Sequence, residues 1–183
     1  HNSSGSYVPV GSPASMGDGI ANNDSVRTAN INIVTTLDIS SKGIQFLTGI
    51  QDFTALEYLD CQNNLLQNLS LSFAQNTALT HLDCSENYID TIDVANNTAL
   101  AYLDCSDNYI DSLNVSQNIN LNQLDCYDNE ITSLTINGAV LLETLNCYDN
   151  QLATLHVNGA ISLKTINCSS NPLTSLDVSA NTA

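Results

Sequence analysis

Three kinds of chemically active side chain recur along this sequence at a nearly fixed spacing: thiols, carboxylates and phenols. The thiols belong to Cys61, Cys84, Cys105, Cys126, Cys147 and Cys168. The first two are 23 residues apart and each later pair is 21 apart. Thiols can form disulfides, bind metal ions or act as nucleophiles, so the spacing must be explained structurally before any chemistry is assigned to them.

Two columns of carboxylates follow the same period. One stands directly before the cysteine position, as Asp38, Asp60, Asp83, Asp104 and Asp125, and is continued by Asn146 and Asn167. The other stands two residues after the cysteine, as Glu86, Asp107, Asp128 and Asp149. Carboxylates about 5 Å apart repel by roughly 1 kcal/mol even in water, so hydration, Ser or Thr hydroxyls, or cations must compensate. Two interpretations stay open: a solvated acidic face, and a surface for divalent cations or a cationic partner.

Aromatic side chains share this part of the repeat. Tyr58, His81 and Tyr102 stand two residues before the aspartate column, Tyr127 and Tyr148 follow cysteines, and Tyr88 and Tyr109 follow a recurrent asparagine. Exposed tyrosine is typical of interfaces, because it offers contact area and a hydrogen bond at low entropic cost. It also suits stacking on sugar rings. The alternative is that these rings only cover strand backbone.

The elements that position these residues are repeats. The unit is LxxLxCxxNxLxxLxV plus about five linking residues, as in LTHLDCSENYIDTIDV from Leu79. Copies start near 34, 56, 79, 100, 121, 142 and 163, and the first has Ile39 and Lys42 in place of cysteine and asparagine. One such coil cannot bury its apolar side chains alone, but stacked coils bury a continuous core. We therefore expect seven stacked coils at a strand spacing of about 4.8 Å.

Each coil should contain one short parallel strand in the x-Leu-x-Cys-x segment. Because side chains alternate across a strand, Leu59 and Cys61 are expected to point inward, and Tyr58, Asp60 and Gln62 outward. Neighbouring cysteines then lie a strand spacing apart, which is wider than the ~3.8 Å between Cβ atoms in a disulfide. A straight row of thiols also does not form a tetrahedral zinc site. We expect six buried free thiols, with a redox or metal role as the lesser alternative.

The recurrent asparagines stand where each strand turns away into a loop. They are Asn64, Asn87, Asn108, Asn129, Asn150 and Asn171. A buried amide at a turn can bond backbone groups that the turn leaves unpaired. We interpret this column as architectural rather than ligand-binding.

The pattern resembles the leucine-rich-repeat family, and within it the 21-residue, cysteine-containing type found in internalin-like surface proteins of bacteria. The resemblance covers residues 34–183. It implies an α/β-type solenoid dominated by short parallel β-strands, a right-handed superhelix of seven coils with little or no helix. It also implies that residues 1–33 are the remnant of an N-terminal cap and that the repeat domain, 34–183, is truncated at its C-terminus.

Charge and motifs exclude several classes of function. The net charge is −16, with 19 acidic residues against Arg27, Lys42 and Lys164, so no basic patch is available for nucleic acid or anionic membrane. No apolar run reaches the ~18 residues of a membrane-spanning helix. Nucleophile elbows, HExxH motifs and phosphate-binding glycine loops are missing from the sequence, and we expect no catalytic residues and no enzyme.

A cofactor is not expected, although Asp18 and Asp24 enclose a segment rich in oxygen ligands that is a weak candidate for calcium. An ordinary Asx-rich turn explains that segment better.

The favoured function is recognition at a bacterial cell surface or by a secreted protein, with adhesion as one use. The ligand, a protein or polysaccharide, would bind an acidic, tyrosine-rich concave face made by Tyr58, Asp60, His81, Asp83, Tyr102, Asp104, Asp125, Tyr127 and Tyr148. The alternative is a structural spacer or assembly segment of a longer surface protein, with end-to-end association of copies.

Overall fold

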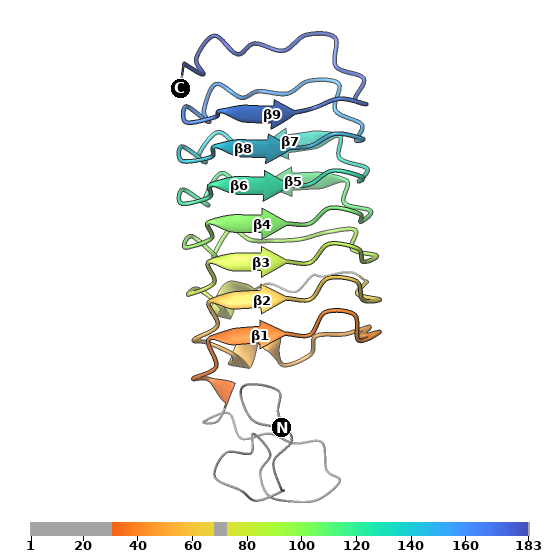
Figure 1. Ribbon diagram of the computed structural model, residues 1–183, viewed down its shortest axis with the longest axis vertical. Coiled ribbons are helices and arrows are strands. Elements are labelled where there is room, and N and C mark those ends of the chain that lie inside the picture. The colour runs from red at the N-terminus through yellow and green to blue at the C-terminus, as the bar shows by residue number, and fades with distance from the viewer. Residues whose placement is uncertain (1–30, 68–72, 183) are drawn as a thin grey trace, which may run out of the picture.

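Seven strands, one in each coil, form a single parallel sheet along one side of the molecule. The computed structural model describes residues 31–67 and 73–182, and all structural statements below concern these residues. The strands are β1 (Thr36–Asp38), β2 (Tyr58–Asp60), β3 (His81–Asp83), β4 (Tyr102–Asp104), β6 (Gln123–Asp125), β8 (Thr144–Asn146) and β9 (Thr165–Asn167). They stack in the order β1-β2-β3-β4-β6-β8-β9 (Figure 1). The predicted solenoid of seven coils is confirmed.

Equivalent residues of successive coils pair in register across this sheet. Leu82 of β3 stands opposite Leu59 of β2 and Leu103 of β4, and the aspartates that follow these leucines pair in the same way. The strand leucines from Leu59 to Leu145 are fully buried. The second apolar column, which includes Leu66, Ile89 and Ile110, is also buried. Alternation along each strand therefore sends leucine and cysteine inward, and the residues between them to the outer face of the sheet.

The return half of each coil is less regular. Strands β5 (Ser112–Asn114) and β7 (Ser133–Thr135) pair in parallel as a two-stranded sheet, which lies behind the seven-stranded sheet in Figure 1. Gln67 pairs with Tyr88, and His156 with Asp177, as single bridges. The helices named in the structure are the 3₁₀ turns η1 (Ile50–Asp52) and η2 (Phe73–Gln75). Within the described residues, no helix is long and apolar enough to span a membrane.

Two expectations fall on parts of the chain that are not described. Most of the segment read as a cap remnant, residues 1–30, lies outside the described residues. So do Asp18 and Asp24, the candidate calcium ligands. Elsewhere in the described chain, no group of three or more His, Cys, Asp or Glu side chains is arranged to hold a metal ion.

Candidate binding surface

The cysteine column lies inside the solenoid. All six cysteines are free, and five of them are buried, whereas Cys168 is only partly buried. Cys168 belongs to the last coil, so a neighbouring coil packs against it on one side only. The Cys61 thiol donates a hydrogen bond to the backbone oxygen of Asp83 in the next coil at 3.2 Å. Burial raises the pKa of the Cys147 thiol to about 12, so this thiol is protonated and unsuited to nucleophilic or metal chemistry at neutral pH.

The asparagine column joins successive coils at the end of each strand. Asn87 is typical. Its Nδ2 donates to the backbone oxygens of Cys61, Cys84 and Ser85 at 2.9–3.1 Å, and its Oδ1 accepts from the backbone N–H of Leu66 at 3.0 Å. Both ends of the amide are therefore occupied by backbone groups of two coils. This leaves no part of Asn87 free for a ligand.

A second asparagine column, which the sequence analysis missed, crosses the return half of the coils. Asn76, Asn97 and Asn118 are fully buried. The Nδ2 of Asn97 donates to the backbone oxygens of Phe73 and Asn76, both at 2.9 Å, and Asn118 repeats this one coil later. The sequence does carry the signal, because Asn97 and Asn118 each follow an asparagine of the first column by ten residues. Ala139 and Ala160 interrupt the column.

The outer acidic column occupies a turn beside the sheet rather than the strand face itself. Glu86, Asp107, Asp128 and Asp149 have φ values of 49–53°, in the left-handed region, as does Asn63. They lie one residue beyond the last position that faces outward from the strand. Burial and the charges of Asp128 and Glu86 raise the pKa of Asp107. The acidic residues therefore form two adjacent rows instead of one face. The strand aspartates make one row, and the sharp turn after each strand sets the outer acidic column beside it.

The strand aspartates form the row on the sheet face. Asp104 Oδ1 accepts hydrogen bonds from the backbone N–H and the hydroxyl of Ser106, at 3.0 and 2.6 Å. Asp83 makes the same pair of bonds with Ser85. Burial raises the pKa of Asp104 to about 6, against the bonds from Ser106, and the charges of Asp83 and Asp125 raise it further. Asp60 and Asp125 are buried. Hydrogen bonds and partial burial thus place these carboxylates in one row that is partly shielded from water.

Two stacks of aromatic rings flank this row. The His81 ring lies between those of Tyr58 and Tyr102, with ring centroids 4.3 and 4.2 Å away and planes within 9° of parallel. In the next two coils, at the other side of the aspartate row, the Tyr127 and Tyr148 rings stack at 4.8 Å. Burial lowers the pKa of His81, against the charges of Asp83 and Asp60, so the imidazole is neutral at pH 7.

All nine residues predicted to bind a ligand thus share the face of the seven-stranded sheet, which we call the sheet face. Tyr88 and Tyr109 do not join it. Their rings, 6.1 Å apart, lie beyond the turn and are about half exposed. They form a separate surface pair.

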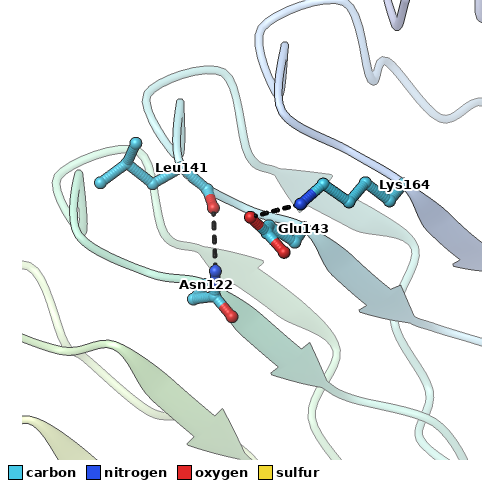
Figure 2. Close-up of polar contacts among 4 residues, drawn as sticks. All are labelled: Asn122, Leu141, Glu143 and Lys164. Carbon is cyan, nitrogen blue, oxygen red and sulfur yellow. Dashed lines mark hydrogen bonds and ion pairs between the residues drawn. The ribbon is translucent and has the colours of Figure 1, made fainter. Parts of the chain in front are cut away.

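Cations are nearly missing from the sheet face. The ion pair found in the described chain joins Lys164 to Glu143 at 2.8 Å, just before strands β9 and β8 (Figure 2). In the same view, Asn122 Nδ2 donates to the backbone oxygen of Leu141 at 3.5 Å. Lys42 Nζ donates to the backbone oxygen of Ser40 at 2.8 Å in the first coil. The aspartates from Asp60 to Asp125 therefore have no cationic partner among the described residues.

Two hollows of the described chain lie away from the sheet face. They measure about 140 and 220 Å³ and lie on the return half of the coils, one beside His156 and Asp177 and the other beside β5 and β7. Small-molecule sites are typically larger, at about 300–1,000 Å³. The sheet face instead repeats aromatic and charged side chains over successive strands, which suits a macromolecular ligand.

The sequence and the fold were compared with those of known proteins. The sequence profile of leucine-rich repeats, in two copies, matches residues 54–97. The functional domain of InlJ from Listeria monocytogenes, described as including a cysteine ladder, is 30% identical, with a TM-score of 0.50 over 86% of this chain and 44% of that domain. The chain therefore has a leucine-rich-repeat fold of the internalin type.

Other solved leucine-rich-repeat structures share the fold. A leucine-rich-repeat protein of Leptospira interrogans matches with a TM-score of 0.73 and 24% identity, over 84% of this chain and 42% of that one. The internalin InlF of Listeria monocytogenes matches with a TM-score of 0.59 and 20% identity, over 82% and 52%. The chain spans less than half the length of InlJ and of the Leptospira protein. No curated protein matches the sequence.

Proposed function

We propose that this leucine-rich-repeat chain is a recognition module of a secreted or surface-attached bacterial protein, and that it binds a protein ligand on the sheet face. The observation that carries the proposal is the pair of ring stacks beside one row of half-buried carboxylates. Buried aromatic groups next to desolvated polar groups are typical of binding hot spots. The likeness to internalin-type proteins supports the bacterial surface location and a use in adhesion.

The stacking geometry favours a protein over a polysaccharide. Sugar rings pack on a free aromatic face, but the faces of the Tyr58, His81 and Tyr102 rings lie against one another at 4.2–4.3 Å. Free faces remain only at the ends of each stack. The edges and hydroxyl groups along the stacks instead offer hydrogen bonds and apolar contact, which protein side chains use readily.

The test is binding of the chain to arrays of purified extracellular proteins and of glycans. We expect protein ligands whose affinity falls at least tenfold in the variant Tyr58→Ala/Tyr102→Ala/Tyr127→Ala. The matched control is Tyr88→Ala/Tyr109→Ala, which removes exposed rings beyond the turn and should change affinity less than twofold. Affinities that none of these substitutions changes would refute a sheet-face site and favour a structural spacer.

A further inference from the structure

The aspartate row of the sheet face carries a charge that the fold does not need. In the last coil, Asn167 takes the place of the aspartate, and its Oδ1 accepts from the backbone N–H and the hydroxyl of Ser169 at 3.3 and 2.8 Å. This is the same pair of bonds that Asp104 makes with Ser106. Where a serine follows two residues later, an asparagine therefore accepts the same pair of bonds without carrying a charge. What the aspartates add is negative charge.

That charge is costly in the free molecule. Asp60 and Asp125 are buried and Asp104 is half-buried, so water screens them poorly. The register of the sheet sets Asp60, Asp83, Asp104 and Asp125 side by side, at a strand spacing of about 4.8 Å. Their compensation comes from neutral donors: serine hydroxyls, backbone N–H groups, Gln62, and Gln123, whose Nε2 donates to Asp125 at 2.6 Å. An unpaired row of this kind fits a ligand that supplies the cations.

From this row we propose that the sheet face binds an extended basic segment of a protein, whose arginine side chains pair with carboxylates along the row from Asp60 to Asp125. This inference rests on the proposed function and names the chemistry of its ligand. Arginine fits better than lysine, because its planar group bonds carboxylates in pairs and stacks on tyrosine rings. The free end of each ring stack offers such a face.

The dimensions favour alternate arginines. Four aspartates on successive strands span about 14 Å at the strand spacing. In an extended segment, side chains two residues apart point the same way and lie about 6.8 Å apart. Three arginines at alternate positions therefore also span about 14 Å and match the row. The methylene groups of these arginine side chains can pack against the flanking aromatic rings.

The experiment measures fluorescence anisotropy of a labelled peptide Arg-Ser-Arg-Ser-Arg with the full chain in 0.15 M salt. The variant Asp83→Asn/Asp104→Asn/Asp125→Asn should raise Kd at least tenfold. The control Asp52→Asn/Asp93→Asn/Asp111→Asn removes three exposed charges away from the sheet face and should raise Kd less than twofold. Thermal unfolding at pH 7.5 should show the first variant to be at least as stable as the parent chain, so that lost binding is not lost folding.

Three results would overturn the proposal. Equal weakening of binding by the two triple variants would show attraction to net charge alone. Failure of the peptide to bind would exclude a basic ligand of this kind. Competition by spermine as strong as that of excess unlabelled peptide would show a small polycation site instead. If the peptide fails while the tyrosine variant still loses its array ligands, recognition by the sheet face stands and only the basic ligand is wrong. If the peptide binds but the tyrosine variant loses nothing, the proposed function fails instead.

Discussion

Asp104 and Asn167 hold the same position in different coils. Comparing them distinguishes the hydrogen bonds that the fold requires from the negative charge that only the aspartate carries. Both accept the two hydrogen bonds of the turn from the serine two residues later. Only the aspartate must also be ionised beside other aspartates in a half-buried row. Burial raises its pKa to about 6, and Asp83 and Asp125 add to this, well above the ordinary value near 3.9. The folded chain therefore holds the Asp104 proton more tightly than the unfolded chain does.

This pKa shift predicts a pH-dependent gain from Asp104→Asn. Between about pH 4 and pH 6, the folded state binds a proton that the unfolded state has released, so stability due to Asp104 falls as the pH rises. The substitution removes that loss. At pH 7.5 we expect the free energy of unfolding to rise by up to about 3 kcal/mol, and the gain to disappear towards pH 4. Urea unfolding at several pH values measures it.

The control for this prediction is Asp38→Asn in the first coil. Asp38 makes the same bonds with Ser40, but it is exposed, and those bonds lower its pKa. A lowered pKa stabilises the folded state above the ordinary pKa, and this contribution is lost in acid. Asp38→Asn should therefore give no gain at pH 7.5. A loss of stability in Asp104→Asn, or a gain independent of pH, would contradict the account.

At the scale of elements, the strands could be predicted and the return half of the coils could not. In each coil, a leucine (Ile166 in β9) and a following cysteine or isoleucine face the core, so a strict sequence pattern predicts the register directly. In the return half, neighbouring coils are packed together in two different ways. Some coils use an asparagine such as Asn97, and others use the pairs Gly138-Ala139 and Gly159-Ala160. A Cβ on Gly138 would meet the backbone oxygen of Ser116, so these coils run closer together.

The second asparagine column predicts a local loss of stability in Asn97→Ala. The substitution removes the Nδ2 group that bonds Phe73 and Asn76, and it leaves a void without the glycine that accompanies alanine in other coils. We expect the free energy of unfolding to fall by about 1–3 kcal/mol, measured by urea denaturation. Asn96→Ala, a change at the exposed neighbouring residue, should be nearly neutral. Equal effects at both positions would show that the column is not structural.

The composition of the candidate site could be read from the sequence, but its geometry could not, for a related reason. The columns of Tyr, His and Asp are visible in the sequence once the repeat is aligned. Whether neighbouring rings stack or splay depends on side-chain rotation, which the period does not determine. The same holds for the outer acidic row, where the left-handed turn after each strand carries Asp107 and Asp128 to the side of the sheet.

The whole molecule is a stack of coils in which some residue columns form the core and others form the surface. Cysteine, leucine and asparagine columns hold the coils together and are nearly uniform, whereas the columns on the sheet face change from coil to coil. Tyr58, His81 and Tyr102 give way to Gln123 in the next coil. At the position after the cysteine, Ser85 and Ser106 give way to Tyr127 and Tyr148. Repeat proteins use such variation on a constant scaffold to shape extended binding surfaces. The net charge of −16 would speed the approach of a basic ligand.

Hydroxyl-radical footprinting of the chain, free and bound to the array protein with the highest affinity, tests the central claim most directly. The tyrosines report on two surfaces at once, because Tyr58, Tyr102, Tyr127 and Tyr148 lie on the sheet face while Tyr88 and Tyr109 lie beyond the turn. The account predicts that binding lowers oxidation of the first four several-fold and leaves the other two unchanged. Protection of Tyr88 and Tyr109 without protection of the sheet-face tyrosines would contradict it.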